Sequence, residues 1–238
     1  MTYNIHSGVG VDQRYDLGRI GRVLNEERPD IAALQELECG SARTSFDDQS
    51  SVLATNLALA SSFCATRPAG QGSFGLGVLS AFPVLHQQHY DLSYRTGREP
   101  RSCLRVDLEV APAAVLHVFT CHLGLGAWER TFQRNQMLSD AILLSQELRH
   151  PVVLMGDFND RPISVVHRHL RKHFSDVFAA AGKRGGPTFK AGPVALRLDH
   201  IYVSRRIRVL ESRVRSDEVT RVASDHRPVI AAVEVTWP

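Results

Sequence analysis

The apolar positions near the start of the chain follow first the spacing of a strand and then that of a helix. Residues 1–6 alternate apolar and polar side chains, as a half-buried strand does. From 17 to 28 the apolar positions recur three or four residues apart, which predicts an amphipathic helix. Asp16 is a candidate N-cap for this helix, and Pro29 would end it.

The middle of the chain is predicted to consist mostly of strands. Short apolar runs separated by Gly and Pro are typical of strands joined by tight turns. The elements expected between residues 30 and 121 are a strand over 30–37, a helix over 50–60, and strands over 62–66, 74–80, 84–91, 101–110 and 115–121.

Helices and strands alternate again in the second half. The longest predicted helix covers 127–149, and Pro151 ends it. Trp128 at its start either lines a substrate cleft or packs against the core, and we favour the core. A buried strand starts at Val152, and the Gly- and Pro-rich residues 182–193 are expected to form a loop. The remaining expected elements are a helix over 163–173 and strands over 196–203, 207–214 and 227–235.

This order of elements favours an α/β (α+β) fold with mixed sheets. A doubly wound parallel sheet would need strands and helices to alternate throughout, whereas the middle of this chain has successive strands. Because no repeat or linker divides the sequence, we expect residues 1–238 to form a single domain.

Composition and charge add three constraints. The 238 residues are 43% hydrophobic and 22% charged, which is enough apolar material for a sizeable core. No apolar run approaches the roughly 20 residues of a membrane span, and no signal peptide precedes the first strand, so we expect a cytoplasmic protein. The four cysteines are scattered and are expected to be free thiols.

The charge is uneven along the chain. Residues 161–227 contain 15 Lys or Arg and 6 Asp or Glu, although the whole chain has a net charge of only +3. A basic C-terminal third suits a phosphate-bearing partner. The alternative is a solvated strand face or loop, and the arginines concerned are Arg205, Arg206, Arg208, Arg213 and Arg215.

Polar residues stand at the ends of the predicted strands. The buried run Val152–Met155 leads through Gly156 directly into Asp157, Asn159 and Asp160. Burying such groups costs several kcal/mol unless they are paired, so they indicate a metal, a ligand or a turn. Sites in α/β proteins form where strand ends meet. The other strand ends of this kind hold Asn4, Glu36, Thr120–His122, Asp199–His200 and Ser224–Arg227.

The chemistry of these side chains favours a hard metal ion and a phosphate ester. Carboxylate and amide oxygens prefer Mg²⁺, Mn²⁺ or Ca²⁺ over Zn²⁺. His122 and His226 remain available for proton transfer or for contact with phosphate. Such a set suits metal-assisted hydrolysis of a phosphate ester. The oxygen donors are Glu36, Asp157, Asp199 and Asp225, with Asn4 and Asn159 as amides.

Six short motifs resemble those of the endonuclease/exonuclease/phosphatase superfamily, and they occur in the family's order. The resemblance implies a DNase I-like four-layer α/β sandwich, in which two mixed, mainly antiparallel sheets are flanked by helices. It also implies Mg²⁺ or Mn²⁺ as the cofactor. The motifs are Tyr3-Asn4, Leu34-Gln35-Glu36, Thr120-Cys121-His122-Leu123, Gly156-Asp157-Phe158-Asn159, Leu198-Asp199-His200-Ile201 and Ser224-Asp225-His226-Arg227-Pro228.

The resemblance also implies roles for the matching positions. Glu36 would be the principal metal ligand, assisted by Asn4 and Asp225. Asp157 would orient or deprotonate the attacking water, and Asn159 would fix the phosphate or the nucleophile.

The remaining implied roles concern the phosphate. His226 would contact the scissile phosphate and act as acid or base, held by Asp199, and His122 would stabilise the transition state. The tyrosine with which abasic-site endonucleases contact phosphate has no counterpart that we can place. Arg101 is our candidate for that contact.

We expect a monomeric metal-dependent phosphodiesterase, and the basic C-terminal third favours nucleic acid as its substrate. A phospholipid or sphingolipid phosphodiesterase binding a lipid headgroup, an inositol-phosphate-type phosphatase and an inactive binding domain remain alternatives. Asp160 is expected to be an N-cap or turn residue, and His200 to pack beside Asp199. His6 and His167 are interpreted as structural or solvated.

Overall fold

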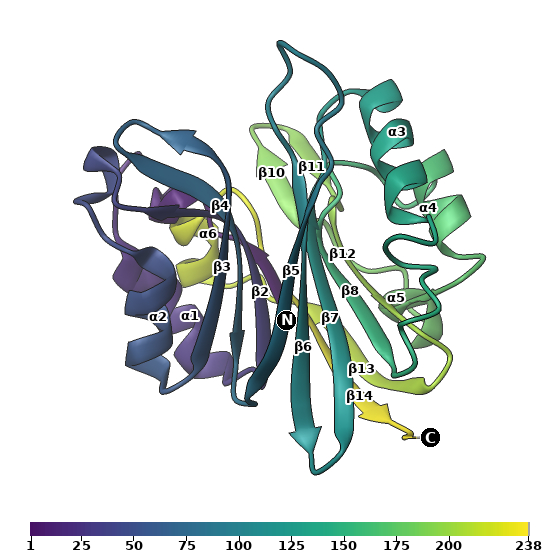
Figure 1. Ribbon diagram of the computed structural model, residues 1–238. Coiled ribbons are helices and arrows are strands. Elements are labelled where there is room, and N and C mark those ends of the chain that lie inside the picture. The colour runs from purple at the N-terminus through teal and green to yellow at the C-terminus, as the bar shows by residue number, and fades with distance from the viewer. Residues whose placement is uncertain (238) are drawn as a thin grey trace.

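Two six-stranded β-sheets pack face to face, and helices cover their outer faces (Figure 1). The computed structural model describes residues 1–237. Both sheets are mixed and mainly antiparallel, so the four-layer α/β sandwich predicted from the sequence is confirmed.

The first sheet joins the two ends of the chain. Its strand order is β13-β14-β1-β2-β4-β3, and its one parallel pair is β1 with β2. Its strands are β1 (Thr2–Asn4), β2 (Ile31–Cys39), β3 (Ala60–Ala69), β4 (Gly72–Ser80), β13 (Ile207–Val214) and β14 (Val229–Val235).

The second sheet is built from the middle of the chain. Its order is β5-β6-β7-β8-β12-β9, and its one parallel pair is β7 with β8. A separate two-stranded hairpin, β10 (Phe189–Ala191) with β11 (Val194–Leu196), lies outside both sheets. The strands of the second sheet are β5 (Val84–Asp91), β6 (Ser102–Ala111), β7 (Ala114–His122), β8 (Val152–Asp157), β9 (Ser175–Asp176) and β12 (Asp199–Val203).

The helices are short, and all the α-helices except α3 begin at a side-chain cap. As predicted, Asp16 caps the first helix by accepting a hydrogen bond from the Arg19 amide, and the left-handed residue Arg28 ends it just before Pro29. The helices are α1 (Leu17–Glu27), α2 (Gln49–Leu57), α3 (Ala127–Met137), α4 (Val165–Leu170), α5 (Val177–Ala180) and α6 (Glu218–Ala223), with 3₁₀ turns η1 (His6–Gly8) and η2 (Ala42–Thr44).

Each central strand buries both of its faces, which explains its continuous apolar run. In β8, Val153 and Met155 belong to the core between the sheets. Val152 and Leu154 point the other way, into the core that also holds residues of α3 and α4. A third core lies between the first sheet and helices α1 and α2. Full burial of one such side chain stabilises the fold by about 1.5–3 kcal/mol.

The long helix predicted over 127–149 is wrong in its second half. Helix α3 ends at Met137, and the chain continues through successive turns. There the Ser139 carbonyl accepts the amides of Ile142 and Leu144. Turns can bury apolar residues at the same spacing as a helix, so the pattern did not separate the two. Trp128 is also not in the core, because 82% of it is exposed.

Four other features differ from the prediction. The expected loop over 182–193 contains strand β10, and the strand expected over 196–203 begins only at Asp199. Helix α6 was not predicted, because its six residues are too few to show a helical period. Helix α2 stops at Leu57 instead of residue 60.

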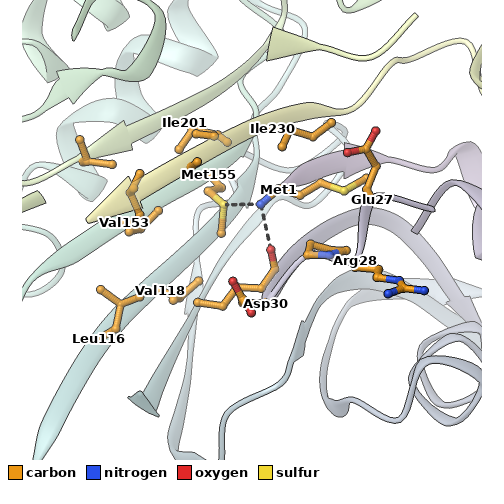
Figure 2. Close-up of a pocket in the computed structure, with 16 residues that line it drawn as sticks. Met1, Glu27, Arg28, Asp30, Leu116, Val118, Val153, Met155, Ile201 and Ile230 are labelled. Carbon is orange, nitrogen blue, oxygen red and sulfur yellow. Dashed lines mark hydrogen bonds between the residues drawn. The ribbon is translucent and has the colours of Figure 1, made fainter. Parts of the chain in front are cut away.

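An apolar cavity of about 320 Å³ lies between the sheets at the end where β1 and β2 begin (Figure 2). Aliphatic side chains such as Val153 and Ile201 line it. The Met1 amino group donates a hydrogen bond to the Ile31 carbonyl at 2.8 Å and lies 4.0 Å from the Met155 sulfur. The cavity holds no group of converging acids and histidines. Within residues 1–237, no helix combines the length and the apolar character needed to span a membrane.

Candidate active site

The polar strand ends predicted from the sequence meet at one end of the sandwich. Asn4 ends β1, His122 ends β7, and Asp157 ends β8. Parallel pairing of β7 with β8 places His122 beside Asp157, and antiparallel pairing of β8 with β12 places Asp199 on its other side. The sheet register therefore assembles this part of the site.

Glu36 reaches the site through an irregularity in β2. The sequence predicted that the strand ends at Glu36, whereas β2 continues to Cys39. Its pairing with β4 shifts between Gln35 and Leu37, and Glu36 has a left-handed φ of 58°. Such a bulge redirects one side chain. The Glu36 side chain is 22% exposed, whereas both neighbouring residues are fully buried.

Asn4 ties the carboxylates of the two sheets together. Its Nδ2 donates to Glu36 Oε1 at 2.8 Å and to Asp157 Oδ2 at 3.0 Å. Its Oδ1 accepts the backbone N–H of His6 at 3.0 Å. Asn4 is completely buried, so every polar atom of its amide is paired inside the protein.

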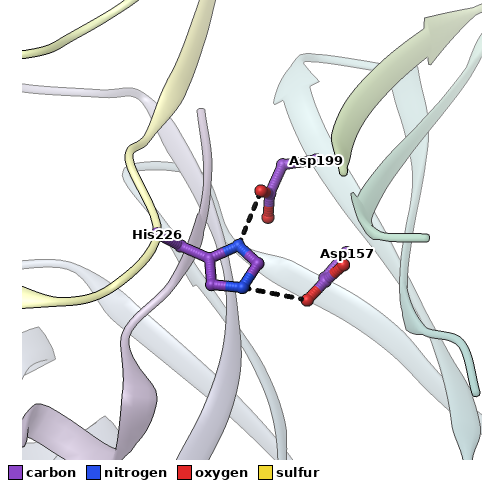
Figure 3. A group of neighbouring side chains, drawn as sticks. All are labelled: Asp157, Asp199 and His226. Atoms are coloured by element: carbon purple, nitrogen blue, oxygen red, sulfur yellow. Dashed lines mark hydrogen bonds and ion pairs between the residues drawn. The ribbon is translucent and has the colours of Figure 1, made fainter. Parts of the chain in front are cut away.

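His226 lies between two carboxylates (Figure 3). Its Nδ1 is 2.7 Å from Asp199 Oδ2, and its Nε2 is 3.6 Å from Asp157 Oδ2. Burial disfavours the charged imidazole, but the carboxylates of Asp199 and Asp157 outweigh that cost and raise the pKa of His226 to about 10. The imidazole is therefore protonated at neutral pH.

The two carboxylates beside His226 differ in their surroundings. Burial raises the pKa of Asp157 well above its ordinary value, although His226 acts in the opposite direction. Asp199 is fully buried, and its Oδ1 has no hydrogen-bond partner among residues 1–237. The Asp199 backbone N–H donates to the Thr188 hydroxyl at 3.1 Å, which helps to fix the residue.

His122 faces the opposite side of Asp157. Its Nε2 lies 3.6 Å from Asp157 Oδ2 and 4.0 Å from Glu36 Oε1. Arg101 Nη1 lies 3.1 Å from His122 Nδ1, and Arg101 Nη2 donates to Glu99 Oε2 at 2.7 Å. Burial, with the positive charge of Arg101, holds the pKa of His122 well below its usual range, so its imidazole is neutral.

Asn159 and Asp225 complete the predicted set. Asn159 has a left-handed φ of 47°, and its backbone N–H donates to Asp157 Oδ1 at 2.8 Å. Its Nδ2 donates to the Leu123 carbonyl at 2.8 Å. The Asp225 side chain is 32% exposed, and its Oδ1 lies 3.9 Å from His6 Nδ1.

A cleft of about 520 Å³ opens above these residues. Asn4 and Asp199 lie beneath its surface. The other seven predicted residues line it: Glu36, Arg101, His122, Asp157, Asn159, Asp225 and His226.

Several residues of the cleft were not predicted. His6, interpreted as structural or solvated, lines the cleft. Phe189 of the β10–β11 hairpin packs on His226, with ring centroids 5.0 Å apart. Apart from Phe74 in the buried strand β4, most of these residues lie in loops, in an edge strand or in the hairpin, where no buried apolar run marks them. The other unpredicted residues that line the cleft are Arg43, Arg67, Phe74, Glu99, Leu125, Leu196 and Leu198.

A buried pair of histidines lies behind the site. The rings of His167 and His200 have centroids 3.9 Å apart, and each Nε2 lies 3.2 Å from the Asp160 carbonyl oxygen. His167 Nδ1 is 2.7 Å from the Tyr202 hydroxyl. Burial, with the neighbouring His200, lowers the pKa of His167 to about 2. Neither histidine reaches the cleft.

Asp160 is a turn residue and not a cap. Its Oδ1 accepts the N–H of Arg161, and its Oδ2 pairs with Arg130 Nε at 3.2 Å. Ser164 caps helix α4 instead. Asp160 therefore lies outside the site.

A sequence model of the endonuclease/exonuclease/phosphatase family matches residues 1–226, which include every candidate site residue. The chain belongs to the endonuclease/exonuclease/phosphatase family. Members of this family are hydrolases that act on phosphoester bonds. A comparison with curated proteins gave no match.

Solved structures share the fold of this endonuclease/exonuclease/phosphatase family member at low sequence identity. A family protein from Beutenbergia cavernae has a TM-score of 0.78 at 23% identity, and the match covers 98% of this chain and 70% of that one. The human Nocturnin catalytic domain with bound sulfate has a TM-score of 0.79 at 18% identity, covering 98% and 92%. A mannosyl-6-phosphatase from Bacteroides thetaiotaomicron has a TM-score of 0.73 at 17% identity, covering 98% of each chain.

The arginines of β13 in this family member form ion pairs on the surface of the sheet. Arg208 pairs with Glu234 at 2.7 Å, and Arg213 Nη1 donates to Glu27 at 3.0 Å. None of the predicted arginines of β13 lines the cleft. For Arg208 the ion pair supports the solvated strand face, whereas Arg213 also lines a second hollow outside the cleft.

Proposed function

We propose that the chain is a single-domain, divalent-metal-dependent phosphodiesterase that cleaves nucleic acid by attack of an activated water. The observation that carries the proposal is the row Asp199–His226–Asp157, which faces the carboxylates of Glu36 and Asp225 in one cleft. In this site the protonated imidazole of His226 can act as the acid, and the unpaired carboxylates of Glu36 and Asp225 can bind the metal.

Glu36 and Asp225 fit a hard cation. Both carboxylates are partly exposed in the cleft, and neither forms an ion pair with Lys or Arg in the part of the chain described. Carboxylate oxygens are the ligands that Mg²⁺ and Mn²⁺ prefer. When bound, either ion would offset the charge of the phosphoryl oxygens.

The group Asp157, Asp199 and His226 is compact enough to hold a metal, since its ligand atoms lie within 4.8 Å of one another. We favour Glu36 and Asp225 because a protonated His226 offers no lone pair and Asp199 is sealed from the cleft. Asn4 uses both amide atoms within the protein. We therefore assign Asn4 the role of orienting Glu36 instead of binding the ion.

Proton transfer is assigned to the row itself. Asp157, whose pKa is raised by burial, can accept a proton from water near neutral pH. The Nε2–H of His226 can contact the scissile phosphate and supply a proton to the leaving oxygen. Asp199 fixes the His226 ring through the 2.7 Å contact at Nδ1 and stabilises its charge.

The opposite side of the cleft would hold the phosphate. Arg101 is only 6% exposed but lines the cleft, so its guanidinium can contact a phosphoryl oxygen. Neutral His122 can donate a hydrogen bond to the same group as charge develops. The Asn159 amide is held by Leu123, which leaves its oxygen for water or phosphate.

Two observations bear on the substrate. Leu125 lines the cleft, and the exposed Trp128 follows in the first turn of α3. An exposed aromatic ring near a phosphodiester site supports base stacking. The same surface would suit a lipid headgroup and its chains, so a lipid phosphodiesterase is the second candidate.

The proposal is tested with Mg²⁺ or Mn²⁺ on bis-p-nitrophenyl phosphate, plasmid DNA, oligonucleotides, sphingomyelin and inositol phosphates, with and without chelator. We expect turnover that requires metal and is fastest on nucleic acid. No turnover of any substrate would refute the enzyme assignment.

Two variants separate the proposed roles. Glu36→Ala should weaken Mn²⁺ binding measured by calorimetry and lower activity, whereas His226→Ala should lower activity about 100-fold or more and leave Mn²⁺ affinity nearly intact. Glu147→Ala, at an exposed glutamate that does not line the cleft, is the control. Loss of Mn²⁺ binding in His226→Ala would place the ion in the Asp157–Asp199–His226 group instead.

A further inference from the structure

A second hollow, of about 710 Å³, lies on the other side of the β10–β11 hairpin from the cleft. We call it the basic pocket. None of its lining residues is Asp or Glu. Its cationic residues are Lys183, Lys190, Arg213, Arg221 and Arg227.

Arg227 forms the buried part of the basic pocket. The residue is only 9% exposed, and its guanidinium has no hydrogen bond or ion pair with any of residues 1–237. Only its backbone N–H is engaged, donating to the Thr188 carbonyl at 2.6 Å. The guanidinium nitrogens still have access to solvent in the pocket, because none of them is a fully buried atom without a partner. An anion in the pocket would therefore meet an arginine whose stem is held by the protein and whose charge has no partner of its own.

A second buried polar group in the basic pocket also lacks a partner. The hydroxyl of Ser212 is buried and makes no hydrogen bond within the described chain. Ser212 lies on β13 and lines the pocket together with Arg213. The hydroxyl is covered in this structure, so it would donate to an anion in the pocket after rotation of the Ser212 side chain.

The hairpin forms a wall between the basic pocket and the cleft. Phe189 and Leu196 are paired in the hairpin and line the cleft, whereas the next pair, Lys190 and Ala195, lines the basic pocket. One face of the hairpin thus lines the cleft and the other lines the basic pocket, because successive side chains along a strand point to opposite faces. Consecutive residues of the last motif divide in the same way.

His226 lines the cleft and Arg227 lines the basic pocket. A ligand that carries more than one phosphate could therefore place one at His226 and another beside Arg227. Arginine is well suited to the second position, because its guanidinium forms two parallel hydrogen bonds with a phosphate.

We propose that the basic pocket binds a phosphate group other than the one that is hydrolysed, with Arg227 and Ser212 at its base and Lys190 and Arg221 at its opening. The phosphate comes either from the same substrate strand or from a free phosphate anion. The first source rests on the proposed function, whereas the second does not.

The test compares two double variants that each remove two positive charges from exposed side chains. Lys190→Gln/Arg221→Gln alters the opening of the basic pocket, and Arg205→Gln/Arg206→Gln alters the start of β13 as the matched control. Because all four residues are exposed, both proteins should fold, and thermal unfolding verifies this.

Binding is measured in chelator with two probes, inorganic phosphate and a fluorescent single-stranded 12-mer of thymidylate (about 12 nucleotides, to span several phosphate contacts). The cleft also carries Arg101 and the protonated His226 and can bind phosphate, so the contribution of the basic pocket is read from the difference between the two double variants. We expect the pocket variant to bind phosphate roughly tenfold more weakly and the control to change by less than about twofold.

The oligonucleotide identifies the source of the phosphate. If the pocket holds a phosphate of the strand, the slope of log affinity against log salt should fall by about 0.7 in the pocket variant, the value for one lost phosphate contact on a single strand. An unchanged slope with weakened phosphate binding would assign the pocket to the free anion. Equal behaviour of the two double variants with both probes would overturn the proposal.

Failure of the pocket and failure of the proposed function give different results. Suppose that the wild type cleaves bis-p-nitrophenyl phosphate, but that the Lys190→Gln/Arg221→Gln variant binds phosphate as tightly as the wild type does. This result would refute only the phosphate site in the basic pocket. Suppose instead that the wild type shows no metal-dependent turnover, but that its phosphate affinity still depends on Lys190 and Arg221. This result would refute only the proposed phosphodiesterase activity.

Discussion

Gly156 joins the sheet to the site, and replacing it with alanine should disturb both. Its φ is +150°, and it pairs with Cys121 in the parallel β7–β8 ladder. A Cβ built at this position would lie 2.1 Å from the Cys121 carbonyl oxygen and 2.9 Å from the Cys121 nitrogen. Real Cβ contacts essentially never fall below 3.0 Å, so the strands must separate by about 1 Å.

The magnitude follows from two terms. Holding alanine at this φ costs about 1–3 kcal/mol, and weakening one or two ladder hydrogen bonds costs about 1 kcal/mol each. A total of about 3–4 kcal/mol should lower the melting temperature of a protein of this size by roughly 10 °C. Because Asp157 is the next residue, the same 1 Å shift should lower turnover about 100-fold.

The assay pairs thermal unfolding with hydrolysis of bis-p-nitrophenyl phosphate at a temperature where every protein is folded. Gly182→Ala is the matched control, since Gly182 has a φ of +69° and nothing lies within 4 Å of its built Cβ. It should show only the backbone cost of about 1–2 kcal/mol and full turnover. If Gly156→Ala melts and turns over like Gly182→Ala, the close approach of β7 and β8 at this residue is not what positions Asp157.

Three further outcomes test other parts of the structure. The pKa of His167 is held near 2, below its unfolded value of 6.5, so the unfolded state binds the proton first and stability falls as pH drops below 6.5. Between pH 7 and pH 4.5 the free energy of unfolding of His167→Gln should therefore fall by about 3 kcal/mol less than that of the wild type, measured by urea unfolding. Asp199→Asn should lower the pKa of His226, shift the alkaline limb of the pH–activity profile to lower pH and reduce turnover about 100-fold. Trp128→Ala should change stability by less than about 0.5 kcal/mol and raise KM for oligonucleotides.

Each of these has a contrary result. An equal loss of stability on acidification in wild type and His167→Gln would show that other groups control acid unfolding. An unshifted alkaline limb in Asp199→Asn would remove His226 as the proton donor. A large loss of stability in Trp128→Ala would place that ring in contact with the core.

The site residues at the strand ends could be predicted from the sequence, because a polar residue next to a buried strand is costly unless it is paired or functional. Asp157 follows a run of four apolar residues, and Asp199 starts a strand in which every residue is buried. The cost of desolvating a carboxylate marks such positions as paired or functional. The mixed-sheet α/β class followed from the order of the predicted elements, whereas the four-layer sandwich was implied by the resemblance to the family.

Other features depend on geometry that no local pattern carries. Glu36 enters the cleft through a bulge in β2, and the sequence around it shows only a continuous strand. Phe189 and Arg227 reach their hollows through pairing of the hairpin with distant segments. The turns after Met137 bury Ile142 and Leu143 as a helix would, so apolar spacing alone could not reveal the break.

The pairing of β1 with β14 makes the site one of the last parts of the protein that can form. Thr2 pairs with Val229, and the Ser224 hydroxyl donates to the Asn4 carbonyl at 2.9 Å. At typical rates of translation, a ribosome needs roughly 10–40 s to proceed from Asn4 to Ser224. Throughout that time the nascent chain carries Asn4, and later Glu36, without His226, the proposed proton donor. Hydrolytic activity during synthesis would therefore report that translation has passed the last motif, and a product interrupted before that motif would be released inactive.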